Sequence, residues 1–340
     1  MTHSQSVVVY GATGHTGRFV VAELRRRGFT AILSGRNAEA LAQQVRQAAT
    51  PLEARPASVD DPAALDRALA GAAAVINCAG PFATTATPLV EAALRAGIPY
   101  LDVAAEIEAN AATLAGFAAA ETPVIPAMAF YGGLGDLLVT AALGDWTSAD
   151  EVHVAYGLSS WHPTPGTRAA GQVSHERRAG RRVRFAGGAL QYHDDAVTQQ
   201  DWSFPEPLGR RPVVAEFSMA DIVTVPSHLP VPEVRTYMTL EAARDLADQS
   251  TPAPAAVDDL GRSDQTFVVD VLVTSGGEQR RATARGQDIY AITAPLVVEA
   301  LDRVLSGRVR ASGVASAGAM FDAPDFLRSL EPYLTVTLPS

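Results

Sequence analysis

The chain has 340 residues, 47% hydrophobic and 19% charged, a composition typical of a folded protein with a large core, and its length favours two domains. The net charge of −10 disfavours nucleic acid as a partner, and we find no nucleic-acid motif, metal-ligand motif, signal sequence or apolar run long enough to span a membrane. We therefore expect a cytoplasmic protein.

Lysine is absent, because all 27 basic residues are arginine. This absence excludes chemistry that requires an ε-amine, such as a Schiff base, a pyridoxal phosphate enzyme or the Tyr-x-x-x-Lys pair of short-chain dehydrogenases. The single cysteine, Cys78, cannot form an internal disulfide and lies in an apolar stretch that predicts a strand.

Residues 7–17 read Val-Val-Val-Tyr-Gly-Ala-Thr-Gly-His-Thr-Gly and predict a buried strand, a tight turn and the start of a helix. In a dinucleotide-binding βαβ unit, the three glycines permit the turn, the approach of backbone to a pyrophosphate and the packing of helix on strand. The spacing is G-x-x-G-x-x-G rather than G-x-G-x-x-G, but the flanking strand and helix favour a cofactor over a turn without a ligand. The cofactor contacts predicted here are Gly11, Thr13, Gly14, His15, Thr16 and Gly17.

The second predicted strand, residues 30–33, ends in Ser34-Gly35-Arg36. This position lies about twenty residues past the motif, where an NAD site carries an Asp or Glu for the ribose 2′-hydroxyl. No acid is present; Ser34 and Arg36 instead offer a hydroxyl and a guanidinium suited to a 2′-phosphate. We therefore predict NADP (NADPH) as the cofactor, against the alternative of a solvated arginine at the start of the next helix.

Strands alternate with helices up to about residue 126, which predicts an α/β fold with a doubly wound parallel Rossmann sheet. The fourth strand runs into Ala-Gly-Pro-Phe, and a strand that ends in small residues faces the ligand crevice of such a sheet. Asp102 ends the next strand on the same side and Glu106 follows, so that either could hold a ribose or nicotinamide amide, or cap the next helix. Further predicted cofactor contacts are therefore Ala79, Gly80, Pro81, Phe82 and Asp102.

From about residue 151, alternating strands are joined by longer polar loops rich in Pro and Gly, which predicts an inserted α+β domain with a mixed or antiparallel sheet. The amphipathic helix expected at 293–305 resembles the first part of the chain again. We predict a dinucleotide-binding Rossmann domain of residues 1–128 plus 293–340, and a substrate-binding domain of residues 129–292.

With these motifs and the closing stretch Gly313-Val314-Ala315 … Met320-Phe321-Asp322-Ala323, the chain resembles the saccharopine dehydrogenase-like family. That family includes saccharopine reductases, trans-acting enoyl reductases of lipid assembly and carboxynorspermidine-type enzymes. The resemblance implies that NADP(H) lies across the Rossmann domain and that the inserted sheet forms the substrate wall. Family enoyl reductases have an Asp-Ser-Pro-Ser-Asp-like turn where residues 131–136 read Tyr-Gly-Gly-Leu-Gly-Asp, and only the final acid matches.

Two residues are candidates for the proton donor of a hydride transfer. Tyr131 lies at the predicted junction of the domains, where clefts form, although a hinge or packing role would also explain it. His162 follows Trp161 in a predicted loop and titrates near neutrality, although loop histidines are commonly only solvated; His175 is a weaker candidate. We expect the proton to come from Tyr131, His162 or water, and we expect Asp136 to cap the following helix.

Residues 177–184 contain five arginines in eight residues. A solvated hairpin with Gly180 in its turn is one interpretation. The other is a dock for an anion, such as a substrate carboxylate, a phosphopantetheine arm or an acidic carrier protein.

The sequence thus predicts an NADPH-dependent oxidoreductase that transfers a hydride to a polarised C=N or C=C bond of a small or carrier-bound substrate. The alternative is a non-catalytic NADP-binding sensor or scaffold. A homodimer is one possible oligomeric state.

Overall fold

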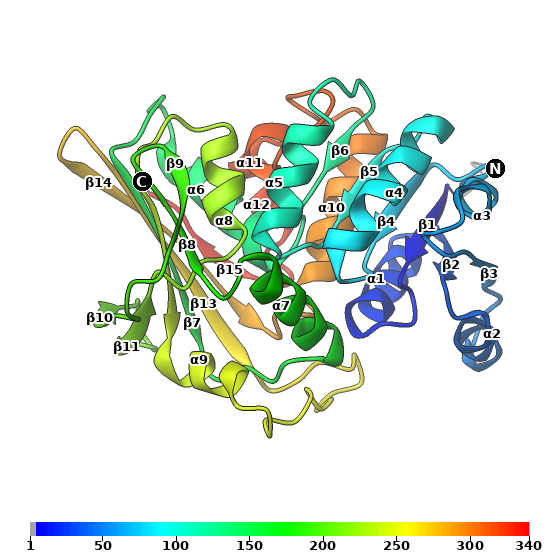
Figure 1. Ribbon diagram of the computed structural model, residues 1–340, viewed down its shortest axis with the longest axis horizontal. Coiled ribbons are helices and arrows are strands. Elements are labelled where there is room, and N and C mark those ends of the chain that lie inside the picture. The colour runs from blue at the N-terminus through cyan, green and yellow to red at the C-terminus, as the bar shows by residue number, and fades with distance from the viewer. Residues whose placement is uncertain (1–4, 340) are drawn as a thin grey trace.

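The computed structural model describes residues 5–339, which form two sheets joined by helices (Figure 1). The first sheet has six parallel strands in the order β3-β2-β1-β4-β5-β6. The strand order reverses between β1 and β4, and ligands bind at such a reversal in open α/β sheets. The strands are β1 (Ser6–Tyr10), β2 (Thr30–Gly35), β3 (Glu53–Pro56), β4 (Ala74–Asn77), β5 (Tyr100–Asp102) and β6 (Val124–Ile125).

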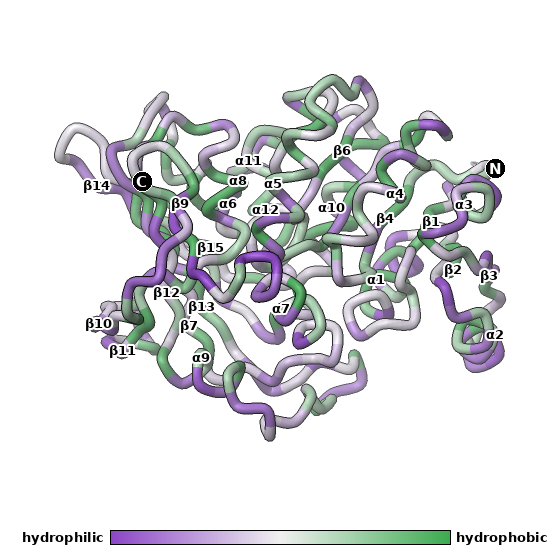
Figure 2. Tube along the Cα trace, viewed as in Figure 1, coloured by the Kyte–Doolittle hydropathy of each residue, from purple (hydrophilic) through white to green (hydrophobic). Residues whose placement is uncertain are grey.

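Helices cover both faces of this sheet because its central strand is apolar on both sides. Val7 and Val9 share one buried cluster with α1, whereas Val8 and Tyr10 share another with α3 and α4. Hydrophilic residues lie along α2 at the periphery (Figure 2). The predicted doubly wound α/β fold is thereby confirmed. The helices are α1 (His15–Arg26), α2 (Ala38–Gln47), α3 (Pro62–Leu69), α4 (Phe82–Ala96) and α5 (Ile107–Gly116).

The second sheet is mixed: β12 runs parallel to β7, and the other pairs are antiparallel. Its main path is β10-β11-β12-β7-β13-β14-β15, with β8 paired to β12 and β9. The apolar helix α6 packs on β13 and β14. The strands are β7 (Glu151–Leu158), β8 (Arg182–Ala186), β9 (Ala189–His193), β10 (Gln199–Ser203), β11 (Arg210–Ala215), β12 (Val234–Thr239), β13 (Thr266–Ser275), β14 (Glu278–Gln287) and β15 (Thr335–Thr337).

The hairpin interpretation of the arginine-rich stretch is wrong. Helix α7 continues to Arg177, and a turn containing Gly180 leads into β8. The sequence of α7 has two glycines and no apolar stripe, so its pattern does not indicate a helix. The remaining helices are η1 (Phe130–Leu134), α6 (Gly135–Leu143), α7 (Pro165–Arg177), α8 (Asp221–Thr224), η2 (Val225–Ser227), α9 (Leu240–Ala247), α10 (Thr293–Leu305), α11 (Ala317–Met320) and α12 (Ala323–Ser329). Within residues 5–339, each helix is too short or too polar to span a bilayer.

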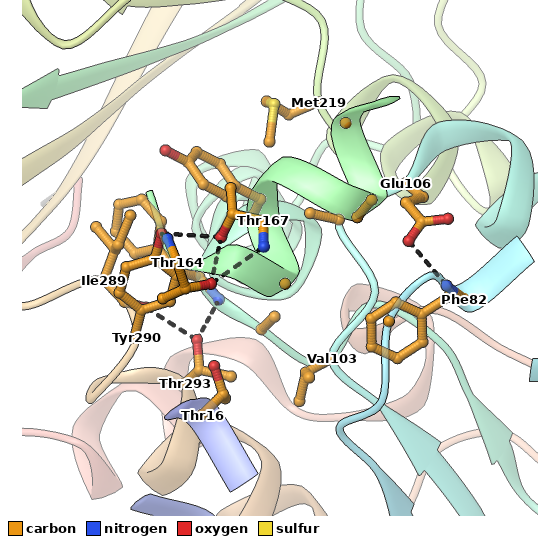
Figure 3. Close-up of a pocket in the computed structure, with 18 of the residues that line it drawn as sticks. Thr16, Phe82, Val103, Glu106, Thr164, Thr167, Met219, Ile289, Tyr290 and Thr293 are labelled. Carbon is orange, nitrogen blue, oxygen red and sulfur yellow. Dashed lines mark hydrogen bonds between the residues drawn. The ribbon is translucent and has the colours of Figure 1, made fainter. Parts of the chain in front are cut away.

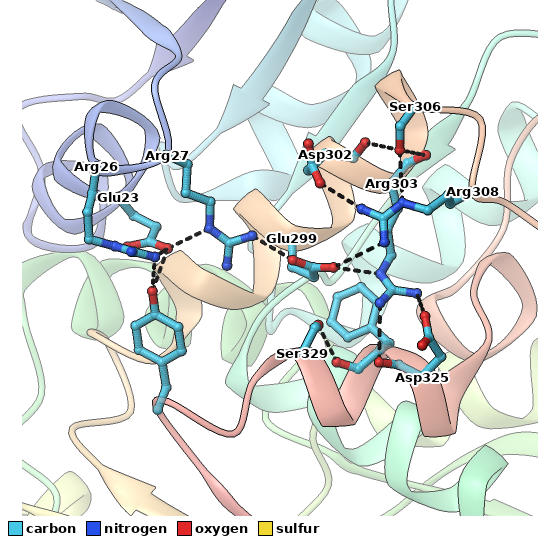
Figure 4. A network of polar contacts seen from close by, with 12 residues as sticks. Glu23, Arg26, Arg27, Glu299, Asp302, Arg303, Ser306, Arg308, Asp325 and Ser329 are labelled. Carbon is cyan, nitrogen blue, oxygen red and sulfur yellow. Dashed lines mark hydrogen bonds and ion pairs between the residues drawn. The ribbon is translucent and has the colours of Figure 1, made fainter.

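The end of the chain returns to the first sheet through α10, which packs along α1 (Figure 4). Glu299 of α10 is buried between two arginines: Arg27 Nη1 lies 2.5 Å from Glu299 Oε2, and Arg303 Nε lies 2.7 Å from Oε1. Removing one member of such a buried group would leave a charge unpaired, so the group fixes α10 on α1. Val314 bridges to Val124 of β6, whereas β15 joins the second sheet. The division into residues 1–128 plus 293–340 and 129–292 stays a prediction.

Candidate functional site

A cavity of about 510 Å³ lies beyond the carboxyl ends of β1, β4 and β5, between these strand ends and segments that adjoin the second sheet (Figure 3). One wall comes from the turn between β1 and α1 and from the segments that follow β4 and β5. The other wall comes from α7, the segment after β11 and the residues that precede α10. This volume is in the ordinary range for small-molecule sites.

The turn between β1 and α1 is built for close approach of backbone. Gly11 has φ +83°, and a Cβ there would lie 2.8 Å from the backbone nitrogen of Ala79. Gly14 is the N-cap of α1 and no side chain caps that end, which leaves the first N–H groups of the helix available to an anion. These features fit the pyrophosphate of a dinucleotide.

Of the two residues predicted to bind the 2′-phosphate at the end of β2, the side chain of Arg36 is free within residues 5–339 and that of Ser34 is already hydrogen-bonded within the protein. Ser34 is fully buried, and its hydroxyl donates to the carbonyl of Arg55 over 2.8 Å. Arg36 is exposed and makes no hydrogen bond or ion pair with the described part of the chain. A 2′-phosphate would therefore find its donor in the guanidinium of Arg36 rather than in the hydroxyl of Ser34.

Two polar side chains shape the segment after β4. Asn77 Oδ1 accepts from the backbone nitrogen of Ala79 over 3.0 Å. Glu106 accepts from the backbone nitrogens of Phe82 at 2.8 Å and Ala83 at 3.1 Å, so it caps α4 and not the helix that follows it (Figure 3). Burial raises the pKa of Glu106. Gly80 and Phe82 consequently line the cavity.

Asp102 is buried beneath the site rather than open to it. Its carboxylate accepts hydrogen bonds from the backbone nitrogens of Ala104 at 3.0 Å and Ala127 at 2.8 Å, and from the Tyr100 hydroxyl at 2.9 Å. Burial raises the pKa of Asp102 to about 6. The side chain thus ties the end of β5 to the segment that carries Tyr131, and any effect on a cofactor would be indirect.

Tyr131 lies in the cavity wall, with its ring 4.8 Å from the Tyr156 ring and 5.3 Å from the Trp161 ring. Its hydroxyl is buried and has no hydrogen-bond partner within residues 5–339. Burial raises the pKa of Tyr131 well above its usual range, with Tyr290 and Asp221 adding to the rise. The hydroxyl is therefore protonated at neutral pH, and it is a hydrogen-bond donor without an acceptor in the described residues.

The backbone after Tyr131 is held by α8. Gly132 has φ +91°, and a Cβ there would lie 2.8 Å from the Cβ of Ala220, so the two segments pack with no room for a side chain. Asp221 accepts from the Tyr156 hydroxyl over 2.8 Å. Burial raises the pKa of Asp221 to about 7. The ring next to Tyr131 is thereby fixed from below.

The expected helix cap at Asp136 is wrong. Asp136 lies within the first turn of α6, fully buried, and its carboxylate contacts His228 Nε2 at 2.7 Å and the backbone nitrogen of Gly318 at 2.7 Å. Asp136 thus joins α6 to Gly318 of α11. Its side chain is not part of the cavity lining.

Tyr290 links the two walls. Its hydroxyl accepts from Trp161 Nε1 at 3.2 Å and lies 2.9 Å from Thr167 Oγ1 of α7 (Figure 3). Its ring lies 5.2 Å from the ring of His15, the first residue of α1. Burial lowers the pKa of His15, and its Nε2 is buried without a partner within residues 5–339. Helix α7 is thus anchored over the nucleotide turn by neutral contacts.

The structure brings six of the predicted site residues to the cavity and leaves nine outside its lining. His162 is among the latter, because its Nδ1 lies 3.2 Å from the carbonyl of Pro252 in the loop after α9. The residues in the lining are Gly14, His15, Thr16, Gly80, Phe82 and Tyr131. Those outside it are Gly11, Thr13, Gly17, Ser34, Arg36, Ala79, Pro81, Asp102 and His162.

Sequence reasoning missed most of the wall formed by the second half of the chain. Phe217 and Met219 follow β11, Leu246 lies in α9 and Tyr290 precedes α10, and none of these three segments carries a motif. Only α7 carries a sequence pattern related to the cavity: its small residues recur every three to four positions and so lie on one face of the helix. The α7 residues in the lining are Pro165, Gly166, Thr167, Ala170, Gly171 and Ser174.

The first part of the chain is similar to known proteins. Residues 7–124 match the family described as saccharopine dehydrogenase NADP binding domain. A saccharopine dehydrogenase-like oxidoreductase of Mus musculus is 31% identical over 118 residues, which cover 29% of this chain and 27% of that protein. A trans-acting enoyl reductase of Mycobacterium tuberculosis is 35% identical over 107 residues, covering 30% of this chain and 25% of that protein. The match thus spans about a quarter of the length of these curated relatives.

A likeness of the whole fold extends beyond this segment. The structure of apo saccharopine dehydrogenase (L-Glu forming) from Saccharomyces cerevisiae superposes with a TM-score of 0.65 and 13% identity, covering 99% of this chain and 100% of that one. At this identity the likeness shows a shared fold. The predicted resemblance and the predicted NADP cofactor are confirmed, whereas the cytoplasmic location and the homodimer stay predictions.

Proposed function

Because residues 7–124 belong to the saccharopine dehydrogenase NADP-binding domain family, we propose that this chain is an NADPH-dependent reductase that acts on a polarised C=C or C=N bond. When bound, NADPH supplies a hydride from C4 of its nicotinamide. The protein has to orient the acceptor bond, exclude water and provide a proton for the atom on which negative charge develops.

The observation that carries the proposal is the Tyr131 hydroxyl. It is buried in a cavity that also contains the nucleotide turn, and it has no partner within residues 5–339. An unpartnered buried hydroxyl is costly unless a ligand satisfies it. A substrate carbonyl or imine nitrogen would accept this hydrogen bond and then the proton.

Tyr131 is favoured over His162 as the donor. The Tyr131 hydroxyl lies in the cavity lining with no partner within residues 5–339, so a substrate atom on which negative charge develops can accept its hydrogen bond and then its proton. His162 lies outside the cavity lining and faces the carbonyl of Pro252. Hydride and proton together add two electrons to the double bond, and solvent returns the proton to Tyr131 after the product leaves.

The test is Tyr131→Phe, which removes one hydroxyl and keeps the ring. With a panel of enones, cyclic imines and acyl thioesters, we expect substrate-dependent NADPH oxidation by the wild type and a rate lower by about 10²–10⁴ in the variant. NADPH affinity by calorimetry should be unchanged.

The matched control is Tyr192→Phe, at a residue 39% exposed on β9, for which no loss is expected. An undiminished rate in Tyr131→Phe would contradict the proton-donor role. Tight NADPH binding with no oxidation by any compound would favour the non-catalytic sensor or scaffold.

A further inference from the structure

The two side chains in the cavity lining that carry a charge, Arg178 and Glu106, already have partners in the protein. Arg178 Nε lies 3.4 Å from Glu108 Oε1 and donates to the carbonyl of Ser174 over 3.1 Å. The carboxylate of Glu106 accepts from two backbone nitrogens of α4. The lining within residues 5–339 contains no other arginine, aspartate or glutamate. A substrate carboxylate would therefore find the one arginine of the lining already paired and the Glu106 carboxylate in the same lining.

The end of the cavity that faces the second sheet is apolar. It is formed by Trp161, Phe217, Met219 and Leu246, which lie on the segment after β7, the segment after β11 and helix α9. Figure 3 shows Met219 on the side of the cavity away from Thr16 and the nucleotide turn. Within residues 5–339, the buried side-chain atoms of the lining that lack a hydrogen-bond partner are Tyr131 Oη and His15 Nε2.

We propose that the substrate is an uncharged, mainly apolar molecule whose hydrophobic body is held by Trp161, Phe217, Met219 and Leu246, with its one polar atom at Tyr131. This inference rests on the proposed function, which it completes by naming a substrate class. Transfer of apolar surface from water into such a pocket is favourable. Transfer of a carboxylate is unfavourable, because the carboxylate loses its hydration and finds no cation to pair with. A substrate of amino-acid type, with two or more charges, does not fit this lining.

Apart from Arg178, the arginines of the 177–184 stretch lie outside the cavity lining and do not supply the missing charge. Arg182 donates to the backbone carbonyls of residues 195, 196, 215 and 216, and Arg184 pairs with Asp195 at 3.0 Å. Arg181 donates to the carbonyl of Arg178 and lies over the Tyr192 ring. These guanidinium groups stabilise the turn and the strands beside it, outside the cavity.

A binding assay can test this without hydride transfer. The protein is loaded with NADP⁺, the neutral fluorescent dye N-phenyl-1-naphthylamine is bound, and two competitors are compared: benzylideneacetone and the same ketone with a ring carboxylate in the para position. We expect the neutral ketone to displace the dye at a concentration at least about tenfold lower than the carboxylate.

Adding a cation to the apolar end should change this preference. In Met219→Arg we expect the carboxylate to gain at least about tenfold relative to the neutral ketone, because the new guanidinium pairs with it. Leu246→Arg is a second variant for the same end, should the first fail to fold. Leu260→Arg is the matched control, since Leu260 is 69% exposed and outside the cavity lining, and its preference should equal that of the wild type.

The outcomes separate the two proposals. Equal or stronger displacement by the carboxylate in the wild type would overturn the apolar substrate class, as would an unchanged preference in folded Met219→Arg and Leu246→Arg. The same competitors are then supplied with NADPH. A preference for the neutral ketone in binding, with no NADPH oxidation by any tested compound, would contradict the proposed reaction and leave an apolar ligand site.

Discussion

The two walls of the cavity are built in different ways. The nucleotide wall comes from two short contiguous stretches, the turn after β1 and the segment after β4. Their backbones lie so close together that Gly11 has no room for a side chain. The opposite wall collects side chains from α7, the segment after β11, α9 and the residues before α10. The first wall is fixed by local backbone geometry and the second by tertiary packing. Substitutions in the first wall should therefore act mainly on nucleotide binding.

The largest effect is expected at Gly11. In Gly11→Ala the new Cβ would lie 2.8 Å from the backbone nitrogen of Ala79, and the residue would keep an unfavourable φ of +83°. We expect NADPH affinity to fall by about 100-fold or more, measured by calorimetry on folded protein.

Gly71→Ala provides the matched control, because Gly71 has a similar φ of +71° with nothing within 4 Å of its Cβ position. It should lose some stability and keep its NADPH affinity. If both variants bound NADPH alike, the close approach of the nucleotide turn to β4 would have no role in binding.

The same contrast explains what the sequence could predict. The parallel sheet followed from apolar strands between helices, and the nucleotide turn from glycines at fixed spacing beside Val7–Tyr10. Helix α7 could not be predicted in this way, because its pattern reflects a cavity lined by small residues rather than a core. The link between Asp136 and Gly318 joins residues 182 positions apart, and no local pattern encodes it.

A second prediction concerns the far end of the nucleotide wall, where sequence reasoning proposed Ser34 and Arg36 together. Since the Ser34 hydroxyl already donates to Arg55, the selectivity for a 2′-phosphate should depend on Arg36. Arg36→Ala should weaken NADPH binding by about 30-fold and leave NADH binding nearly unchanged, because only NADPH carries the dianion.

Arg46→Ala is the control for this variant: it removes an exposed arginine from the neighbouring helix α2 and tests for a general electrostatic effect. Titrations of both nucleotides at two salt concentrations would separate the contributions, since a diffuse charge effect is screened. An equal loss of NADH and NADPH affinity in Arg36→Ala would refute the assignment.

The smallest expected effect concerns the support of Tyr131, whose neighbour Tyr156 donates its hydroxyl hydrogen to the buried Asp221. Burial raises its pKa in the folded protein from the usual 3.8 to about 7, so between these values the folded protein holds a proton that the unfolded chain has released. The stabilisation is therefore complete below about pH 4 and is lost as the pH rises through 7.

Asp221→Asn cannot ionise and should lack this loss. Between pH 6 and pH 8, the free energy of unfolding of the wild type should fall by about 1 kcal/mol more than that of the variant. Denaturant titrations across this range would measure the difference, with Asp259→Asn in an exposed loop as the control whose curve should run parallel to the wild type. Parallel curves for Asp221→Asn as well would mean that the carboxylate is ionised in the fold. The Tyr156 hydroxyl would then donate to a charged group, and a buried negative charge would lie near the proposed proton donor.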